Sequence, residues 1–310
     1  GVIMKYLMGV DGGGTHSRLL VTDLNGNEIY QGIGKSTNIE SNDLETVKKN
    51  FMDLFQEFHN RTNYSKEECL SICIGTAGVD TPESLNLITD LTGNLGYQCF
   101  IEVMNDSEIA LAAETKGKPG IIIISGTGSI GFGVNECGKK WRVGGFGYLV
   151  GDEGSGYWVA RKGIGAALQD FDHSGPKTIL TDMLKEKLEL ERFDKILDYI
   201  YSTNKSEIAK LATLVIQGCE QGDIVSNEIL HKAADYLSRM VITLARELQM
   251  TKQSYPVIYG GGFLTNSPGL CSSINDRILN QYPLLHPSLL KKEAQWGAIY
   301  IAASKAGIKI

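Results

Sequence analysis

The stretch that decides the fold is KYLMGVDGGGTHSRLLVTDLNGNEIYQG, residues 5–32. An apolar run ends in a glycine turn, a second apolar run follows, and an Asn-Gly turn leads into a third. Apolar runs joined by such short turns are typical of antiparallel strands in a β-meander. We therefore expect residues 5–32 to form three hairpin-connected strands.

Residues 119–145, PGIIIISGTGSIGFGVNECGKKWRVGG, repeat this order of strands and turns. Glu136-Cys137-Gly138 stands where the first copy has its Asn-Gly turn. The copies begin at residues 5 and 119, so 114 residues separate them, which is a suitable size for one lobe. We infer a duplicated α/β fold in which each copy opens with a meander.

The segments after each meander predict the remaining elements. Residues 44–60 are amphipathic at helical spacing, residues 69–78 and 100–106 have the pattern of strands, and residues 107–115 that of a helix. This alternation indicates parallel strands in the first lobe. After the second meander the chain is mostly helical in pattern, over 157–171, 177–190, 206–219 and 224–250, with a last strand at 255–263 and a terminal helix at 294–307.

Gly117 and Pro119 interrupt the helical pattern between the two copies. We therefore place the N-terminal lobe at residues 1–116 and the C-terminal lobe at 117–294. The terminal helix, 295–310, is expected to pack back on the N-terminal lobe.

Composition excludes several classes of function. The 310 residues are 42% hydrophobic and carry a formal charge of −6, without a basic run longer than a pair, which argues against nucleic acid or an anionic membrane as partner. The sequence also contains no apolar run of the roughly 18 residues that span a bilayer. Six cysteines occur without a CxxC pair or nearby histidine, so we expect neither zinc nor disulfides. These features, with no leader-like N-terminus, predict a cytoplasmic protein.

The first glycine turn, DGGGT, is a candidate phosphate site. Dinucleotide fingerprints and Walker loops run from a strand into a helix, whereas this turn continues into a strand. Phosphate would therefore be bound by backbone N–H groups of Gly13 and Gly14, with a hydroxyl from Thr15. Asp11 is suited to hold Mg²⁺ through water. The alternative is an ordinary hairpin turn.

The second glycine turn, SGTGS at residues 125–129, changes the balance between these interpretations. Two such turns in equivalent places of a duplicated fold can grip one polyphosphate from both sides. Ser125 and Thr127 offer hydroxyl groups, and Gly126 and Gly128 leave the backbone open to a ligand. We therefore favour a nucleotide clamp.

Three other segments carry candidate polar side chains. Asp106 follows a predicted strand and begins a helix, where a carboxylate could either cap the helix or act as a general base. Asp152 lies in the glycine-rich loop 144–156 with Phe146, a pairing that suits a sugar, although helix capping is again the alternative. Glycines 260–262 would let a flat base lie close to the backbone.

Taken in order, these motifs resemble those of the sugar kinase, Hsp70 and actin ATPase superfamily. Within it the chain is similar to the group holding the N-acetylglucosamine kinases and the BadF/BcrA-type ATPases, and the similarity spans nearly the whole chain. The resemblance implies a duplicated actin-like, ribonuclease H-like fold with two lobes around a nucleotide cleft. It also implies a small-molecule substrate and allows a homodimer.

The resemblance further implies an ATP- and Mg²⁺-dependent transfer of phosphate to the 6-hydroxyl of an N-acetylated amino sugar. N-acetylglucosamine, N-acetylmuramic acid or both would be substrates, in amino sugar salvage or cell-wall recycling. It makes Asp106 the catalytic base and Asp11 the water-mediated Mg²⁺ contact. ATP would be bound by Gly13, Gly14, Thr15, Ser125, Gly126, Thr127, Gly128, Gly261 and Gly262. The sugar would be bound by Ser36, Asn38, Asp106, Gly145, Phe146 and Asp152.

Two departures bear on the sugar side. The animal kinases have tryptophan at the positions of Phe146 and Glu40, so the preferred sugar is open. A second hypothesis is a BadF-type activating ATPase, which couples ATP hydrolysis to electron transfer through an iron–sulfur cluster. Cys137 lies in a turn but lacks the companion cysteine that such a cluster needs.

Overall fold

The computed structural model describes residues 4–310, which divide into two compact units. Residues 1–3 lie outside the described part. The first unit runs to Lys118 and also contains residues 291–310, whereas the second unit is formed by residues 119–290. The sequence placed these changes at 116/117 and 294/295. Each unit contains one five-stranded sheet.

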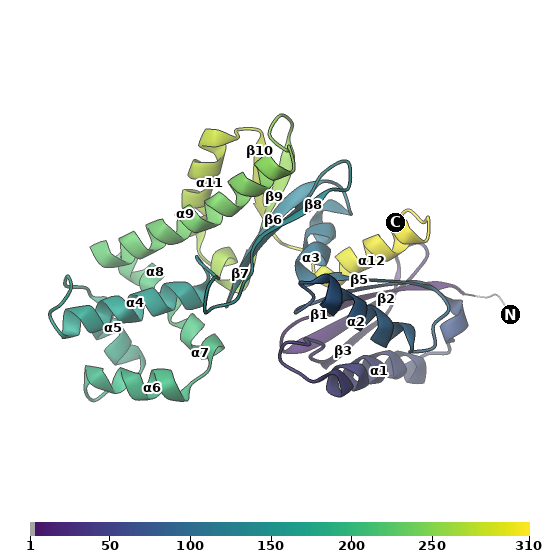
Figure 1. The fold of residues 1–310 in the computed structure, drawn as a ribbon, viewed down its shortest axis with the longest axis horizontal. Helices are drawn as coiled ribbons and strands as arrows, with labels where there is room; N and C mark the ends of the chain where they lie inside the picture. Colours follow the sequence, from purple (N-terminus) through teal and green to yellow (C-terminus); the bar gives the residue numbers. More distant parts are fainter. Residues whose placement is uncertain (1–3) are drawn as a thin grey trace. The chain divides into compact units, whose positions relative to one another are not determined.

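The first sheet is built on the predicted meander (Figure 1). Its strands are β1 (Tyr6–Gly12), β2 (His16–Asp23), β3 (Glu28–Lys35), β4 (Cys69–Thr76) and β5 (Phe100–Asn105), in the order β3-β2-β1-β4-β5. Strands β1, β2 and β3 pair antiparallel, while β4 pairs parallel with both β1 and β5.

The second sheet repeats this topology. Its strands are β6 (Gly120–Ser125), β7 (Ser129–Val134), β8 (Lys140–Gly144), β9 (Tyr255–Gly260) and β10 (Leu285–Leu289), in the order β10-β9-β6-β7-β8. Again the first meander strand is central, antiparallel to the second strand and parallel to a later one. Ile121, Ile122 and Ile123 are fully buried in this central strand. The duplicated α/β fold is confirmed.

Helices cover both faces of the first sheet. They are α1 (Leu44–Arg61), the short η1 (Lys66–Glu68), α2 (Pro82–Gly93), α3 (Asp106–Thr115) and α12 (Ala294–Lys305). Successive residues of β1 alternate between the faces: Tyr6 and Met8 pack in the core with α1, whereas Leu7 packs with α12. A Cβ added at Gly297 of α12 would lie 1.7 Å from the carbonyl oxygen of Ile109 in α3. Glycine therefore allows these two helices to contact backbone to backbone.

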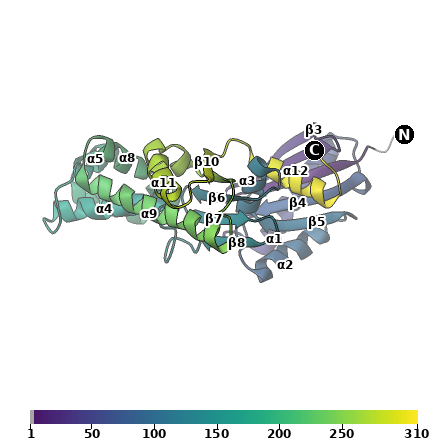
Figure 2. The same cartoon turned by 90° about the horizontal axis from the view of Figure 1, so that it is seen from above.

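The second unit is mainly helical outside its sheet (Figure 2). Its helices are α4 (Gly156–Phe171), α5 (Leu180–Lys187), η2 (Phe193–Lys195), α6 (Ile196–Ser202), α7 (Lys205–Lys210), α8 (Ala212–Glu220), α9 (Ile224–Glu247), α10 (Gly262–Thr265) and α11 (Pro268–Gln281). Leu237, Val241 and Leu244 of α9 are buried in one core with Ile121 and Ile123 of β6.

Several elements have no helix or strand counterpart in the sequence prediction: α2, α6, α10, α11, the short helices η1 and η2, and strand β10. Strand β10 has the sequence LHPSL, in which Pro287 cannot donate a ladder hydrogen bond. The strand lies at the sheet edge and pairs only with β9 among the described strands, a position in which proline is tolerated. The helix predicted over 206–219 is divided at Leu211 into α7 and α8.

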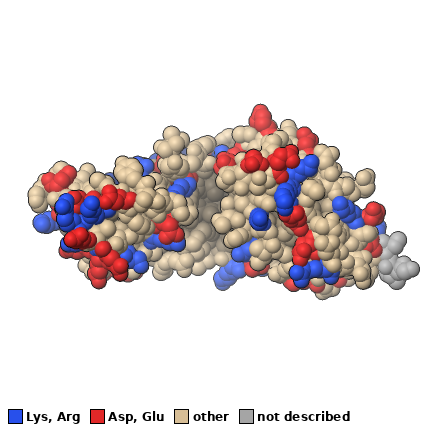
Figure 3. Space-filling model, turned by 90° about the horizontal axis from the view of Figure 1, so that it is seen from below, with Lys and Arg blue, Asp and Glu red and all other residues tan. Residues whose placement is uncertain are grey.

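Charged side chains are interspersed on the surface. On the face drawn in Figure 3, lysine and arginine lie among aspartate and glutamate over both units. Among residues 4–310, no helix is both long enough and apolar enough to span a membrane.

Candidate functional site

The first glycine turn joins β1 to β2, as predicted, and is pinned by a hydrogen bond from the N–H of Gly13 to the carbonyl oxygen of His16, 3.0 Å long. A Cβ at Gly12 would lie 2.2 Å from Oγ1 of Thr37 and 2.5 Å from Oγ1 of Thr76, whereas one at Gly14 would meet nothing within 4 Å. The base of the turn is therefore tightly packed, and Gly14 and Thr15 are exposed. This arrangement leaves backbone N–H groups accessible to an anion.

The loop that carries Ser36 and Asn38 is tied to this turn. Oγ of Ser36 donates to the carbonyl oxygen of Gly13 over 3.3 Å and accepts from the N–H of Asn38 over 3.2 Å. Oδ1 of Asn38 accepts from the N–H of Glu40 over 2.8 Å. Ser36 thus connects the predicted sugar loop to the predicted phosphate turn within the first unit.

Asp106 is the first residue of α3, but the residue that caps the helix is Asn105. Oδ1 of Asn105 accepts from the N–H and the hydroxyl of Ser107 over 2.9 and 2.7 Å, and its Nδ2 donates to Oδ1 of Asp80 over 2.9 Å. The capping interpretation of Asp106 is therefore unnecessary. Its carboxyl group lies half-buried at the carboxyl end of β5, the edge at which open α/β sheets place ligands.

The environment of Asp106 disfavours its charged form. Burial, followed by the charges of Asp11 and Asp80, raises the pKa of Asp106 to about 6, although the N–H of Ser107 partly offsets this. Burial also raises the pKa of Asp11, against the influence of Arg18, its cross-strand partner. A carboxyl group with a pKa close to neutrality is suited to accept a proton from a substrate hydroxyl.

The second glycine turn joins β6 to β7 and is fixed by its own hydroxyl groups. Oγ of Ser125 donates to the carbonyl oxygen of Gly154, and Oγ of Ser129 donates to that of Glu153, each over 2.8 Å. The N–H of Gly156 donates to the carbonyl oxygen of Gly126 over 2.7 Å. Ser125 is 0% exposed, so its hydroxyl stabilises the turn from the interior of the unit.

Gly261 packs directly on this turn. A Cβ there would lie 2.4 Å from the carbonyl carbon and oxygen of Ser125, and the backbone has φ 88° and ψ 139°. Only glycine adopts that conformation readily. The turn after β9 and the turn after β6 therefore meet through backbone, and Gly262 then begins α10.

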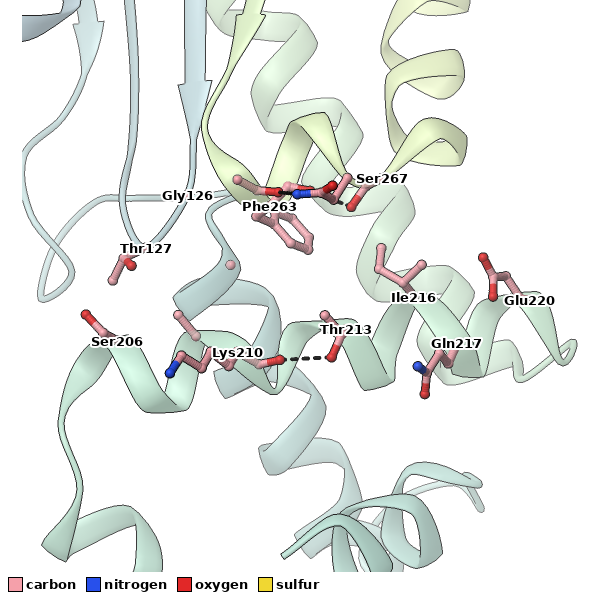
Figure 4. Close-up of a pocket in the computed structure, with 14 residues that line it drawn as sticks. Gly126, Thr127, Ser206, Lys210, Thr213, Ile216, Gln217, Glu220, Phe263 and Ser267 are labelled. Carbon is pink, nitrogen blue, oxygen red and sulfur yellow. Dashed lines mark hydrogen bonds between the residues drawn. The ribbon is translucent and has the colours of Figure 1, made fainter. Parts of the chain in front are cut away.

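A cavity of about 680 Å³ opens beside these two turns, entirely within the second unit (Figure 4). Gly126, Thr127 and Gly262 line it from the turns. Most of its other walls come from α7, α8 and α10, and Gly156, Asn266 and Ser267 complete the lining. Apolar surface is provided by Ile216 and Phe263. The volume and the mixture of apolar and polar lining are those of a small-molecule site.

The polar wall of this cavity was missed by the sequence analysis, although a signal exists. Its members recur at alternating intervals of four and three residues along α7 and α8, which places them on one helical face. They are Ser206, Lys210, Thr213, Gln217 and Glu220. Figure 4 shows Ser206 and Lys210 on one helix, facing Thr127.

The residues predicted for the sugar in the second unit differ in their exposure. The ring of Phe146 is 67% exposed and lies under the guanidinium of Arg142, at 5.5 Å. Gly145, beside it, has φ 73°. Asp152 is only 5% exposed, has φ 58°, and accepts from the N–H of Ser129 over 3.2 Å through Oδ1. Its carboxylate thus lies against the second glycine turn.

The acidic side chains of the first unit bear on metal binding. Within residues 4–310, no three His, Cys, Asp or Glu side chains come together as a metal site. Mg²⁺ that accompanies a nucleotide needs only one or two carboxylates, because waters and phosphates supply its other ligands. Asp11 fits that role, since burial beside Glu293 disfavours its charged form in the absence of a cation.

Comparison with known proteins extends over almost the whole chain. Residues 8–289 match the BadF/BadG/BcrA/BcrD ATPase family. An N-acetylmuramic acid/N-acetylglucosamine kinase from Clostridium acetobutylicum is 38% identical over 304 residues, which are 97% of this chain and 99% of that protein. An N-acetyl-D-glucosamine kinase from Dictyostelium discoideum is 31% identical over 90% of this chain and 92% of its own length.

Solved structures agree on the fold. A chain from Chromobacterium violaceum, provisionally named an N-acetylglucosamine kinase, superposes with a TM-score of 0.75 at 21% identity, covering 97% of this chain and 99% of its own. A ROK hexokinase from Thermus thermophilus superposes with a TM-score of 0.58 at 15% identity, over 97% and 99% of the two chains. At these identities the likeness concerns the fold alone.

Proposed function

Because the chain belongs to the BadF/BadG/BcrA/BcrD ATPase family, with two curated amino sugar kinases among its relatives, we propose that it is an ATP-dependent amino sugar kinase. Its substrate is N-acetylglucosamine, N-acetylmuramic acid or both, and the reaction places phosphate on the 6-hydroxyl. Salvage of amino sugars or recycling of cell-wall fragments in the cytoplasm is the corresponding cellular role.

The observation that carries this proposal is the state of Asp106. The helix is capped by Asn105, and the pKa of Asp106 is raised to about 6 by burial and by the charges of Asp11 and Asp80. At neutral pH the carboxylate is ionised yet basic enough to take the proton of the attacking hydroxyl. Asn38, in the loop tied to Gly13, is the proposed partner for the sugar in the same unit.

ATP is assigned to the glycine turns and the cavity. The base and ribose would occupy the cavity, with Phe263 and Ile216 against the base and the polar face of α7 and α8 against the ribose. In the second unit the N–H group of Gly128 is the candidate phosphate donor, and in the first unit that of Gly14. The N–H groups of Gly13 and Gly126 already donate to the carbonyl oxygens of His16 and Gly128, so these glycines would instead let the backbone come close to the ligand. The fixed turns support this assignment, because preorganised N–H donors stabilise developing charge without reorganisation.

Mg²⁺ would supply charge neutralisation on the phosphate oxygens. Asp11 would hold it through water, consistent with the raised pKa of that carboxyl group.

Substrate-dependent ATP consumption tests the proposal. Purified protein would be screened with N-acetylglucosamine, N-acetylmuramic acid, glucosamine, glucose and N-acetylmannosamine, with and without Mg²⁺. Stimulation by the N-acetylated sugars is expected, and ATP consumption that none of the sugars stimulates would contradict the kinase assignment. Asp106→Asn should retain ADP binding and lose most turnover, by about 10³-fold or more, as for removal of a general base.

A second candidate function is an activating ATPase for electron transfer. It is suggested by the family to which the chain belongs, but not by the two amino sugar kinases that are its relatives. Cys137, the one cysteine that the sequence analysis considered for a cluster, is exposed in the turn between β7 and β8. An iron–sulfur absorption band in purified protein would favour that function and contradict ours.

A further inference from the structure

Lys205 begins α7 and reaches the buried carboxylate of Asp152. Its Nζ lies 3.7 Å from Oδ2 of Asp152, whose side chain is 7% exposed, while that of Lys205 is 35% exposed. A buried carboxylate is costly unless it is both paired and hydrogen-bonded. The N–H of Ser129 supplies a hydrogen bond, and Lys205 supplies the opposite charge.

Lys205 also contacts the loop between β8 and α4. Its Nζ lies 5.0 Å from the centroid of the Tyr148 ring, within the range of a cation–π interaction. Tyr148 in turn packs edge-on against Tyr157 of α4, with centroids 5.4 Å apart. Three of the loop's apolar side chains, Phe146, Leu149 and Val150, are largely exposed.

The same helix forms a wall of the nucleotide cavity. Ser206, Ala209 and Lys210 of α7 line the cavity, so Lys205 stands one residue from its lining. Asn204 caps α7 through a bond from the N–H of Glu207 to its Oδ1, 3.0 Å long, which fixes the start of the helix. Movement of α7 on ligand binding would therefore move the ammonium group of Lys205.

We propose that Lys205 is a positioning residue that couples the nucleotide cavity to the second glycine turn and to the loop of residues 144–151. Through Asp152 it acts on the turn that would bind phosphate, and through Tyr148 on the loop that carries Gly145 and Phe146. It contacts no reacting atom. The proposal rests on the proposed function in that the cavity is taken to bind ATP.

The test makes two measurements on each variant. ADP affinity is measured by calorimetry, and the protection of residues 144–151 is measured by hydrogen exchange with and without ADP. Lys205→Met is expected to weaken ADP binding about tenfold, equivalent to about 1.4 kcal/mol, and to abolish ADP-dependent protection of the loop. Lys205→Arg, which keeps the charge and can lie over an aromatic ring, should restore both. Tyr148→Leu should lose the protection while changing ADP affinity less than threefold.

The matched control is Lys195→Met. Lys195 also lies in the helical part of the second unit and pairs with Asp198 at 3.3 Å, but both side chains are exposed and neither lines the cavity. It should behave like the wild type in both measurements. The proposal would be overturned if Lys205→Met kept the ADP affinity and the loop protection of the wild type. It would also be overturned if ADP did not change the hydrogen exchange of residues 144–151 in the wild-type protein.

Steady-state kinetics with N-acetylglucosamine separate this proposal from the proposed function. For Lys205→Met we expect KM for ATP and for the sugar to rise together, with a smaller fall in kcat. If no sugar is phosphorylated but the ADP responses differ as described, the kinase assignment fails and the role of Lys205 stands. If the sugar is phosphorylated and Lys205→Met behaves as wild type, the kinase assignment stands and the role of Lys205 fails.

Discussion

Replacing Asp106 by asparagine should stabilise the protein while removing its proposed base. A carboxyl group whose pKa is raised on folding costs stability wherever it is ionised. Burial beside Asp11 and Asp80 raises the pKa of Asp106 from 3.8 to about 6. At 1.36 kcal/mol per pKa unit, the cost of keeping this carboxylate ionised is about 3 kcal/mol at pH 8.

The pH dependence of this stability gain separates it from other consequences of the substitution. The raised pKa means that the cost is present above pH 6, declines as the pH falls from 6 toward 3.8, and disappears below 3.8, where the carboxyl group is protonated in both states. Asp106→Asn should therefore raise the free energy of unfolding by about 3 kcal/mol at pH 8 and by less than about 1 kcal/mol at pH 4.

Urea unfolding of the two proteins at several pH values measures this difference. Unfolding would be followed by a signal from the first unit, such as hydrogen exchange of α3, because two units need not unfold together. Glu108→Gln is the control, since Glu108 lies in the same first turn of the helix. A stability gain for Asp106→Asn that is equal at pH 4 and pH 8 would refute the electrostatic reasoning.

The remaining predictions concern rate and packing. The kcat/KM of the wild type should fall tenfold per pH unit below about pH 6, as the base becomes protonated, and a pH profile that stays flat to pH 5 would exclude Asp106 as the base. Gly261→Ala should cost about 3 kcal/mol or more and weaken ADP binding, measured by urea unfolding and calorimetry, because its Cβ would overlap the backbone of Ser125. Gly297→Ala should destabilise the first unit by a similar amount through its overlap with α3, whereas Gly165→Ala, where a Cβ meets nothing within 4 Å, should stabilise α4 by about 0.5–1 kcal/mol.

The sheets could be predicted because their signal is local. Each meander consists of apolar runs interrupted by glycine or Asn-Gly turns, and the repeat of that pattern predicted both the duplicated fold and the positions of the two glycine turns. Strand β10 escaped prediction because Pro287 and its polar neighbours give no strand pattern. Its pairing with β9 depends on tertiary context.

The cavity is harder to find from sequence for a different reason. In residues 206–220 the apolar periodicity indicates only that a helix packs on a core. The polar residues on the opposite face have the pattern of an ordinary solvent-exposed surface. These polar residues line a cavity only together with Gly126 and Gly262, which follow two strands more than a hundred residues apart in the sequence. Likewise, the partner of Asp152 could not be inferred, because Lys205 lies on another element.

Duplication gave the two units the same turn, but the surroundings of the turns differ in chemistry. In the first unit the turn rests on the hydroxyls of Thr37 and Thr76, which lie 3.0 Å apart, and a carboxyl-rich edge adjoins it. In the second unit the turn is held by Ser125 and Ser129 and opens on a cavity. In both, buried hydroxyl groups brace the backbone, so that the exposed N–H groups are fixed before a ligand arrives. We therefore propose that acid–base chemistry belongs to the first copy and nucleotide selectivity to the second, because the carboxyl-rich edge adjoins the first turn and the cavity adjoins the second.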